Sequence, residues 1–177
     1  FIIGSGERAL LCRYTTGRRT LKAQDQLTLE WAGVEAQYHG ALMKTVVIGE
    51  PTQRHIDMHA AAREALLACE AAMQPGRSMR DVYDAHVQVM AGHDLDQHRL
   101  NACGYAMGAS YAPCWMDPHM FHAGASVEME SDMTFFLHMI LMDSDSGTAM
   151  TLGRTSLITP TGAEPLSRLS LDLPCAG

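Results

Sequence analysis

The stretch that decides the fold is LTLEWAGVEAQYHGALMKTVVIG, residues 27–49. Two runs rich in β-forming residues, Leu27 to Gly33 and His39 to Ile48, flank a short polar segment, and this pattern predicts a β-hairpin. The neighbours of Glu30 in LTLEWAG are all apolar or small. A carboxylate among them is costly to bury unless it is paired or used in chemistry, although strand alternation also allows Glu30 to face outward.

The chain after the hairpin predicts two helices. Residues 52–73 are rich in Ala, Leu, Glu and Arg and stop before Pro75-Gly76, which is typical of a helix end. Ser78 is a candidate N-cap for a second helix to about Ala91, in a capping box with Asp81. One face of this second helix carries a stripe that we interpret as core, made of Val82, His86 and Met90.

The remaining segments predict strands. Residues 133–142 and 148–159 are apolar runs joined by the turn sequence DSDSG, and residues 101–113 are rich in Gly and Ala, which favours close backbone packing. Strands paired as hairpins and interrupted by two helices predict an α+β domain with a curved antiparallel sheet and helices on one face.

Composition narrows the functional classes. The 177 residues allow one domain, and the net charge of −7 without a basic cluster argues against a nucleic-acid partner. Five cysteines without CxxC spacing favour reduced thiols in the cytoplasm and indicate neither a disulfide framework nor a structural zinc site. No apolar run approaches the roughly 20 residues of a membrane helix. Because the chain starts at Phe1 and runs straight into FIIGSG, we expect residues 1–177 to be the C-terminal part of a single larger domain.

Four blocks resemble the peptidase M24, or pita-bread, superfamily, which contains creatinase, Xaa-Pro dipeptidases and aminopeptidases, and methionine aminopeptidase. The hairpin at 27–49 is similar to the one that carries two metal-binding carboxylates, and NACGYAMG to the loop with a histidine ligand. EMESDMTFFLHMI and TLGRTSLITPTG resemble the strands that each carry a glutamate ligand. The blocks follow the order of the family, which implies its pita-bread fold.

Carried over by position, this resemblance implies that the usual two-metal site is lost. The five ligand positions fall on Glu30, Ala41, Tyr105, His138 and Gly153. Two remaining ligands do not hold a divalent ion tightly, and a paired-metal mechanism needs bridging carboxylates. We therefore expect no metal and no other cofactor. The chain resembles the metal-free branch of creatinase and ectoine hydrolases, although Met43 stands where creatinase has a catalytic glutamate.

The resemblance makes Glu30 and His138 the candidate catalytic residues. Glu30 would attack an amide or amidine carbon or activate water, and His138 would move a proton. His138 also fits a hydrogen-bonded core histidine. The predicted function is metal-independent hydrolysis of a C–N bond in a small amidine, guanidino or proline-like substrate. The alternatives are an Xaa-Pro peptidase with metal held by Glu30, His138 and Asp143, and an inactive module that binds a ligand or peptide.

Substrate-binding roles are predicted for four further residues. Tyr105 and Tyr111 would donate hydrogen bonds to developing charge, and Arg13 would hold a substrate carboxylate. Trp115 fits either an aromatic wall for the ligand or a packed loop anchor. Relatives of the creatinase kind imply a homodimer as well.

Two other patterns receive structural interpretations. His55 and His59 lie four residues apart on the first predicted helix, but no third ligand follows, so we expect surface positions. Asp143 and Asp145 in DSDSG resemble the start of a calcium loop, but Arg154 occupies the position of its bidentate glutamate, which leaves a hairpin turn.

Overall fold

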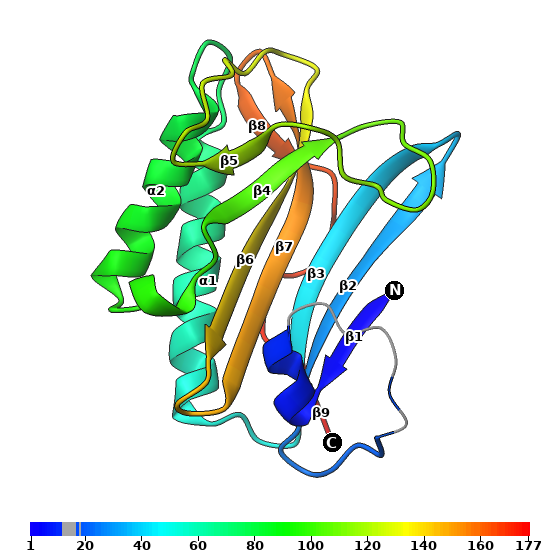
Figure 1. Cartoon of the computed structure of the whole chain (residues 1–177), viewed down its shortest axis with the longest axis vertical. Coiled ribbons are helices and arrows are strands. Elements are labelled where there is room, and N and C mark those ends of the chain that lie inside the picture. The colour runs from blue at the N-terminus through cyan, green and yellow to red at the C-terminus, as the bar shows by residue number, and fades with distance from the viewer. Residues whose placement is uncertain (12–16, 18) are drawn as a thin grey trace.

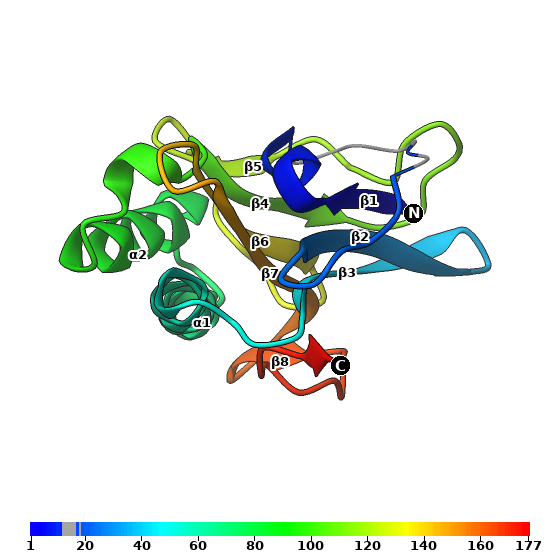
Figure 2. The same cartoon turned by 90° about the horizontal axis from the view of Figure 1, so that it is seen from below.

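A nine-stranded, mainly antiparallel sheet forms the centre of the described structure, and two helices lie against one of its faces (Figure 1; Figure 2). The computed structural model describes residues 1–11, 17 and 19–177. The strand order is β1-β2-β3-β7-β6-β4-β5, with β8 beside β7 and β9 parallel to β3. In chain order the elements are β1 (Ile2–Ser5), η1 (Gly6–Leu11), β2 (Gln26–Glu35), β3 (Tyr38–Ile48), α1 (Gln53–Ala72), α2 (Met79–Gly92), η2 (Asp96–His98), β4 (Ala102–Met107), β5 (Met120–His122), β6 (Thr134–Asp143), β7 (Thr148–Thr159), β8 (Gly162–Pro165) and β9 (Cys175–Ala176).

The predicted hairpin is formed by β2 and β3. Ala36 and Gln37 connect the strands with φ of 48° and 69°. Positive φ at both central residues is characteristic of the type I′ turn, whose twist matches that of antiparallel strands. Burial alternates along β2, so Thr28 and Glu30 lie on the same inner face as Met43, which is paired with Glu30. The outward-facing interpretation of Glu30 is therefore wrong.

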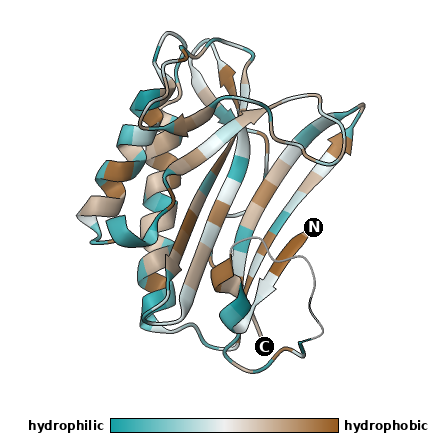
Figure 3. Ribbon diagram, viewed as in Figure 1, coloured by the Kyte–Doolittle hydropathy of each residue, from teal (hydrophilic) through white to brown (hydrophobic). Residues whose placement is uncertain are grey.

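The strand β6 is buried on both faces, and Figure 3 shows it as one of the most hydrophobic segments of the sheet. On one face its side chains pack with α1 and α2 in the larger hydrophobic cluster; we call this the helix face. On the other, which we call the opposite face, they join a smaller cluster with β3 and β4. Phe135, Leu137, Met139 and Leu141 belong to the helix face, whereas Phe136 and Ile140 belong to the opposite face. Helices on one face of the sheet confirm the predicted architecture.

Both helices begin at a side-chain N-cap, and Ser78 is the one that the sequence predicted. The Thr52 hydroxyl accepts from the backbone N–H of His55, and the Ser78 hydroxyl accepts from that of Arg80. Such caps satisfy N–H groups that have no partner within the helix. Asp81 pairs with Arg77 and does not complete a capping box with Ser78. The stripe predicted to be core is fully enclosed, as expected: Val82, His86 and Met90.

The glycine-rich segment before Pro113 confirms the expectation of close backbone packing. A Cβ at Gly104 would lie 2.4 Å from the backbone oxygen of Phe136 on β6. No L side chain fits there without a backbone shift, so glycine lets β4 approach β6 at this point. None of the described helices is long and apolar enough to cross a membrane.

Candidate functional site

Glu30 and His138 lie in one row across the opposite face of the sheet. Strand pairing runs from Glu30 to Met43, from Met43 to Gly153 and from Gly153 to His138. Neighbouring strands are about 4.8 Å apart, so three spacings separate the two backbones by about 14 Å along the sheet. Another group must therefore connect their side chains.

Tyr105 makes that connection. Its hydroxyl donates to Glu30 Oε1 at 3.5 Å and accepts from Trp115 Nε1 at 2.9 Å. Its ring centroid lies 5.6 Å from that of His138, with 51° between the planes. A register shift in β4 between Ala102 and Tyr105 accompanies this placement. Trp115, Tyr105 and Glu30 thus form a relay of hydrogen bonds beside an imidazole.

The cluster is closed to solvent. Glu30 and His138 are each 2% exposed, and Tyr105 is fully buried. Trp115 and Met116, from the segment between β4 and β5, pack against the hydrophobic cluster of this face. A carboxylate held away from water lacks the solvation that weakens it as a base or nucleophile, and an imidazole can carry a proton near neutral pH. The arrangement is therefore equipped for proton transfer.

The structure brings together Glu30, Tyr105, Trp115 and His138 but places another predicted residue apart. Tyr111 is 74% exposed, in the segment after β4. Arg13 lies outside the described residues. The roles assigned to these side chains stay predictions, whereas the packing of Trp115 against the cluster matches its interpretation as a loop anchor.

The five family ligand positions do not form a two-metal site in this chain. Ala41 offers no donor, and its backbone N–H donates to Thr155 Oγ1 at 2.8 Å. At Gly153 a Cβ would meet the backbone oxygen of Leu137 at 2.4 Å and the ring of Phe136 at 3.1 Å, so the space for a glutamate is already filled. Glu30 and His138 remain, without the bridging carboxylates that two ions require. The donor set therefore does not fit a metal pair.

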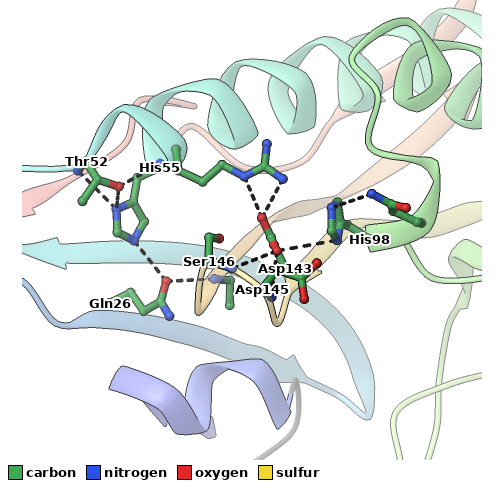
Figure 4. A network of polar contacts seen from close by, with 10 residues as sticks. Gln26, Thr52, His55, His98, Asp143, Asp145 and Ser146 are labelled. Carbon is green, nitrogen blue, oxygen red and sulfur yellow. Dashed lines mark hydrogen bonds and ion pairs between the residues drawn. The ribbon is translucent and has the colours of Figure 1, made fainter.

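Asp143 belongs to a different network, shown in Figure 4. Its carboxylate accepts from the backbone N–H groups of Asp145 and Ser146 and from Arg54 Nε at 2.8 Å. Burial would raise the pKa of Asp143, but the bonds from Ser146 and Arg54 outweigh it and hold that pKa well below the usual range. The predicted hairpin turn is confirmed.

The hypothetical metal set of Glu30, His138 and Asp143 is wrong. Asp143 lies five residues beyond His138 on β6, which is about 17 Å along a strand. Asp143 Oδ2 lies 2.7 Å from Nη2 of Arg54 in α1, so this carboxylate is on the helix face. A peptidase mechanism with this third ligand is therefore not possible.

The expectation that both His55 and His59 lie on the surface is wrong for His55, which is buried (Figure 4). His55 Nδ1 lies 2.8 Å from Thr52 Oγ1, and its Nε2 lies 3.0 Å from Gln26 Oε1. His59 Nε2 instead contacts the Leu171 carbonyl at 2.9 Å. Burial lowers the pKa of both imidazoles. Each histidine therefore has a structural role and links α1 to a different segment, His55 to Gln26 of β2 and His59 to Leu171.

Sequence reasoning missed a buried ion pair between α1 and β7. Arg154 donates to both carboxylate oxygens of Glu70, at 2.7 and 2.6 Å, and the Ser156 hydroxyl adds a bond of 2.8 Å. The charge of Arg154 within the apolar run of β7 was the sequence signal that could have revealed this ion pair. Because this pair lies on the helix face, it holds α1 to the sheet and takes no part in the cluster around Glu30.

Comparisons with known proteins identify the family. The sequence profile of metallopeptidase family M24 matches residues 1–160. An uncharacterized hydrolase/peptidase, y4tM, from Sinorhizobium fredii is 26% identical over 97% of this chain and 43% of the relative. The ectoine hydrolase of Halomonas elongata is 30% identical over 78% of this chain and 34% of that enzyme.

Solved structures show the same fold. The dipeptidase PepE of Mycobacterium ulcerans superimposes with a TM-score of 0.90 at 21% identity, over 98% of this chain and 46% of that protein. The Xaa-Pro dipeptidase of Bacillus anthracis also has a TM-score of 0.90, at 15% identity and with coverage of 98% and 48%.

The chain belongs to metallopeptidase family M24 and has the pita-bread fold. It spans less than half the length of the relatives and structures described above. The predicted resemblance and fold class are thereby confirmed.

Proposed function

We propose that this chain forms the catalytic half of a hydrolase that cleaves a C–N bond in a small substrate without a bridging metal pair. The observation that carries the proposal is the contact of Tyr105 with both reactive groups, since its hydroxyl meets Glu30 and its ring packs beside His138. These groups occupy three of the family's ligand positions, while Ala41 and Gly153 supply no donor at the other two.

The chemistry follows from the positions of the three side chains. The Glu30 carboxylate removes a proton from water, and the oxygen adds to the amidine or amide carbon. The Tyr105 hydroxyl donates to the negative charge that develops on the substrate, and Trp115 Nε1 fixes the orientation of that hydroxyl. Protonated His138 gives its proton to the leaving nitrogen as the C–N bond breaks. Transfer of the proton from Glu30 back to His138 restores both groups.

Access to the cluster requires movement of its cover. Glu30 and His138 are almost fully shielded, and the segment between β4 and β5 supplies Trp115 and Met116 as packing against it. We therefore assign the cover to residues 108–119. Opening this segment admits the substrate, and closing it excludes bulk water during the reaction.

The proposed substrate is a small cyclic amidine or a proline-like amide. Aromatic rings of Tyr105, Trp115 and Phe136 surround the reactive groups and favour a compact, largely apolar ring. The name of one relative, ectoine hydrolase, points to a cyclic amidine, whereas the names of the structural neighbours point to Xaa-Pro dipeptides. Both classes contain a C–N bond next to an electrophilic carbon.

The test combines metal analysis with variant kinetics on the full-length protein. Chromatography monitors the hydrolysis of ectoine and of proline dipeptides by protein that has been treated with a chelator. Glu30→Gln and His138→Gln should each lower kcat by at least about 100-fold, the lower range for loss of a general acid or base. Glu35→Gln, at an exposed position of the same hairpin, should retain wild-type kcat.

Three outcomes separate this proposal from its rivals. Equal turnover by wild type, Glu30→Gln and His138→Gln would refute it. Turnover that disappears with chelator and returns with two ions per chain would assign a metal-dependent peptidase instead. A ligand that raises the melting temperature but stays chemically intact would identify an inactive binding module.

A further inference from the structure

Three soft ligand groups meet inside the helix face, away from the cluster around Glu30. Cys69 comes from α1, His86 from α2 and Cys103 from β4. One ligand atom of each lies within 4.8 Å of the other two. Among the residues that the structure describes, this is the one place where three or more His, Cys, Asp or Glu ligand atoms gather so closely.

All three side chains are enclosed in the domain core. Cys69 and Cys103 are fully buried, and His86 is 1% exposed. Neither ring nitrogen of His86 has a hydrogen-bond partner among the described residues. A buried imidazole without partners is costly, because the polar nitrogens lose their bonds to water and gain none in return. The His86 nitrogens thus lie unsatisfied beside two thiols.

We propose that Cys69, His86 and Cys103 form a binding site for a single thiophilic metal ion of the zinc type. Thiolate sulfur and neutral imidazole nitrogen are the donors such ions prefer. Two thiolates also neutralise a divalent ion, so the complete unit carries no net charge into the apolar core. The ion would connect α1, α2 and β4.

The dimensions are suitable for this ion. Zinc–sulfur bonds of about 2.3 Å and zinc–nitrogen bonds of about 2.0 Å hold ligand atoms roughly 3.5–3.8 Å apart in a tetrahedral site. The present separations are at most 4.8 Å, so side-chain movements that shorten each separation by up to about 1.3 Å close the site. The Cys69 thiol now donates to the Val82 carbonyl at 3.5 Å and would give up this bond on binding.

The form of the ligands makes binding depend on pH. Thiolates are the ligands, so metal binding must displace the protons of Cys69 and Cys103, and affinity should rise with pH.

Titration of the purified protein, in reducing buffer, with Zn(II) and with the spectroscopic probe Co(II) tests the site. We expect one ion per chain, thiolate-to-cobalt charge-transfer bands, and a zinc absorption-edge spectrum with two sulfur neighbours at about 2.3 Å and one nitrogen at about 2.0 Å. Cys69→Ala and Cys103→Ala should each weaken binding by at least about tenfold, since even loss of outer ligand contacts has that effect. Cys114→Ala, at an exposed free cysteine, is the matched control.

A second readout does not depend on variants that fold poorly. Alkylation of wild-type thiols, followed by mass spectrometry, should show Cys69 and Cys103 protected by zinc in partly denatured protein and Cys175 unprotected. Absence of stoichiometric binding by wild type would overturn the proposal. A disulfide between Cys69 and Cys103 in the protein as isolated would overturn it as well, in favour of a redox pair. Neither result bears on hydrolysis at Glu30.

Discussion

The replacement of Gly153 by alanine is a direct test of why this chain lacks the last glutamate of the family pattern. Gly153 lies between Met43 and His138 in the row across the sheet. A Cβ at this position would come within 2.4 Å of the Leu137 backbone oxygen and 3.1 Å of the Phe136 ring. The nearer group is backbone, so β6 and β7 must shift to accept even one methyl group.

The expected destabilisation is about 1–3 kcal/mol, the usual range for an extra methyl group in a packed interior. For a domain of this size 1 kcal/mol corresponds to roughly 2–4 °C in melting temperature, so Gly153→Ala should melt about 2–12 °C below wild type. Gly33→Ala is the matched control, because a Cβ there would meet nothing within 4 Å. It should change stability by less than about 0.5 kcal/mol.

Urea unfolding followed by circular dichroism measures both free energies of unfolding. If Gly153→Ala and Gly33→Ala unfold at the same urea concentration, the steric argument is refuted, and the position is free to carry a larger side chain. If the argument holds, Gly153→Glu should be still less stable and should not create a two-metal site.

Three further predictions follow from contacts elsewhere in the domain. Glu70→Gln should destabilise by up to about 3 kcal/mol by leaving the partly buried Arg154 without its partner charge, and a double-mutant cycle with Arg154→Met should show strong coupling in urea unfolding. The pKa of Asp143 is lower in the folded protein than in the unfolded chain, where it is near 4. The ionised carboxylate therefore stabilises the fold fully above about pH 4, and this stabilisation is lost as the pH falls below that value. Melting curves of wild type and Asp143→Asn should therefore differ more at pH 7 than at pH 3, and a constant difference would contradict the linkage. Trp115→Phe keeps an aromatic side chain but removes the donor to Tyr105, so kcat should fall by roughly tenfold or more with little change in melting temperature.

The local patterns predicted the fold well because they depend on neighbours in the chain. Alternation in residues 27–49 was sufficient for the hairpin, and the composition of residues 52–73 together with Pro75 and Ser78 located the helices to within about two residues. The family resemblance then supplied the pita-bread fold, which periodicity alone does not determine. The expected homodimer, cytoplasmic location and absent N-terminal portion stay predictions.

The candidate site depended on tertiary structure to a larger degree. The family resemblance made Glu30 and His138 candidates, but only the curved sheet and the β4 irregularity place Tyr105 in contact with both. His55 was expected at the surface because helix spacing does not reveal which strand packs beside a helix end. Gln26, its partner, lies 29 residues away in the chain.

Contacts between distant segments explain what the sequence left undecided. Cys69, His86 and Cys103 have no recognisable ligand spacing, and Glu70 is far in sequence from Arg154, yet packing α1 against the sheet brings both sets together. Alternation, capping and turn residues act over a few positions, so the sequence by itself determined the elements but left the direction of Glu30 open. Which side chains meet across the layers was decided by the tertiary structure, because burial in a close-packed interior depends on every element that surrounds it.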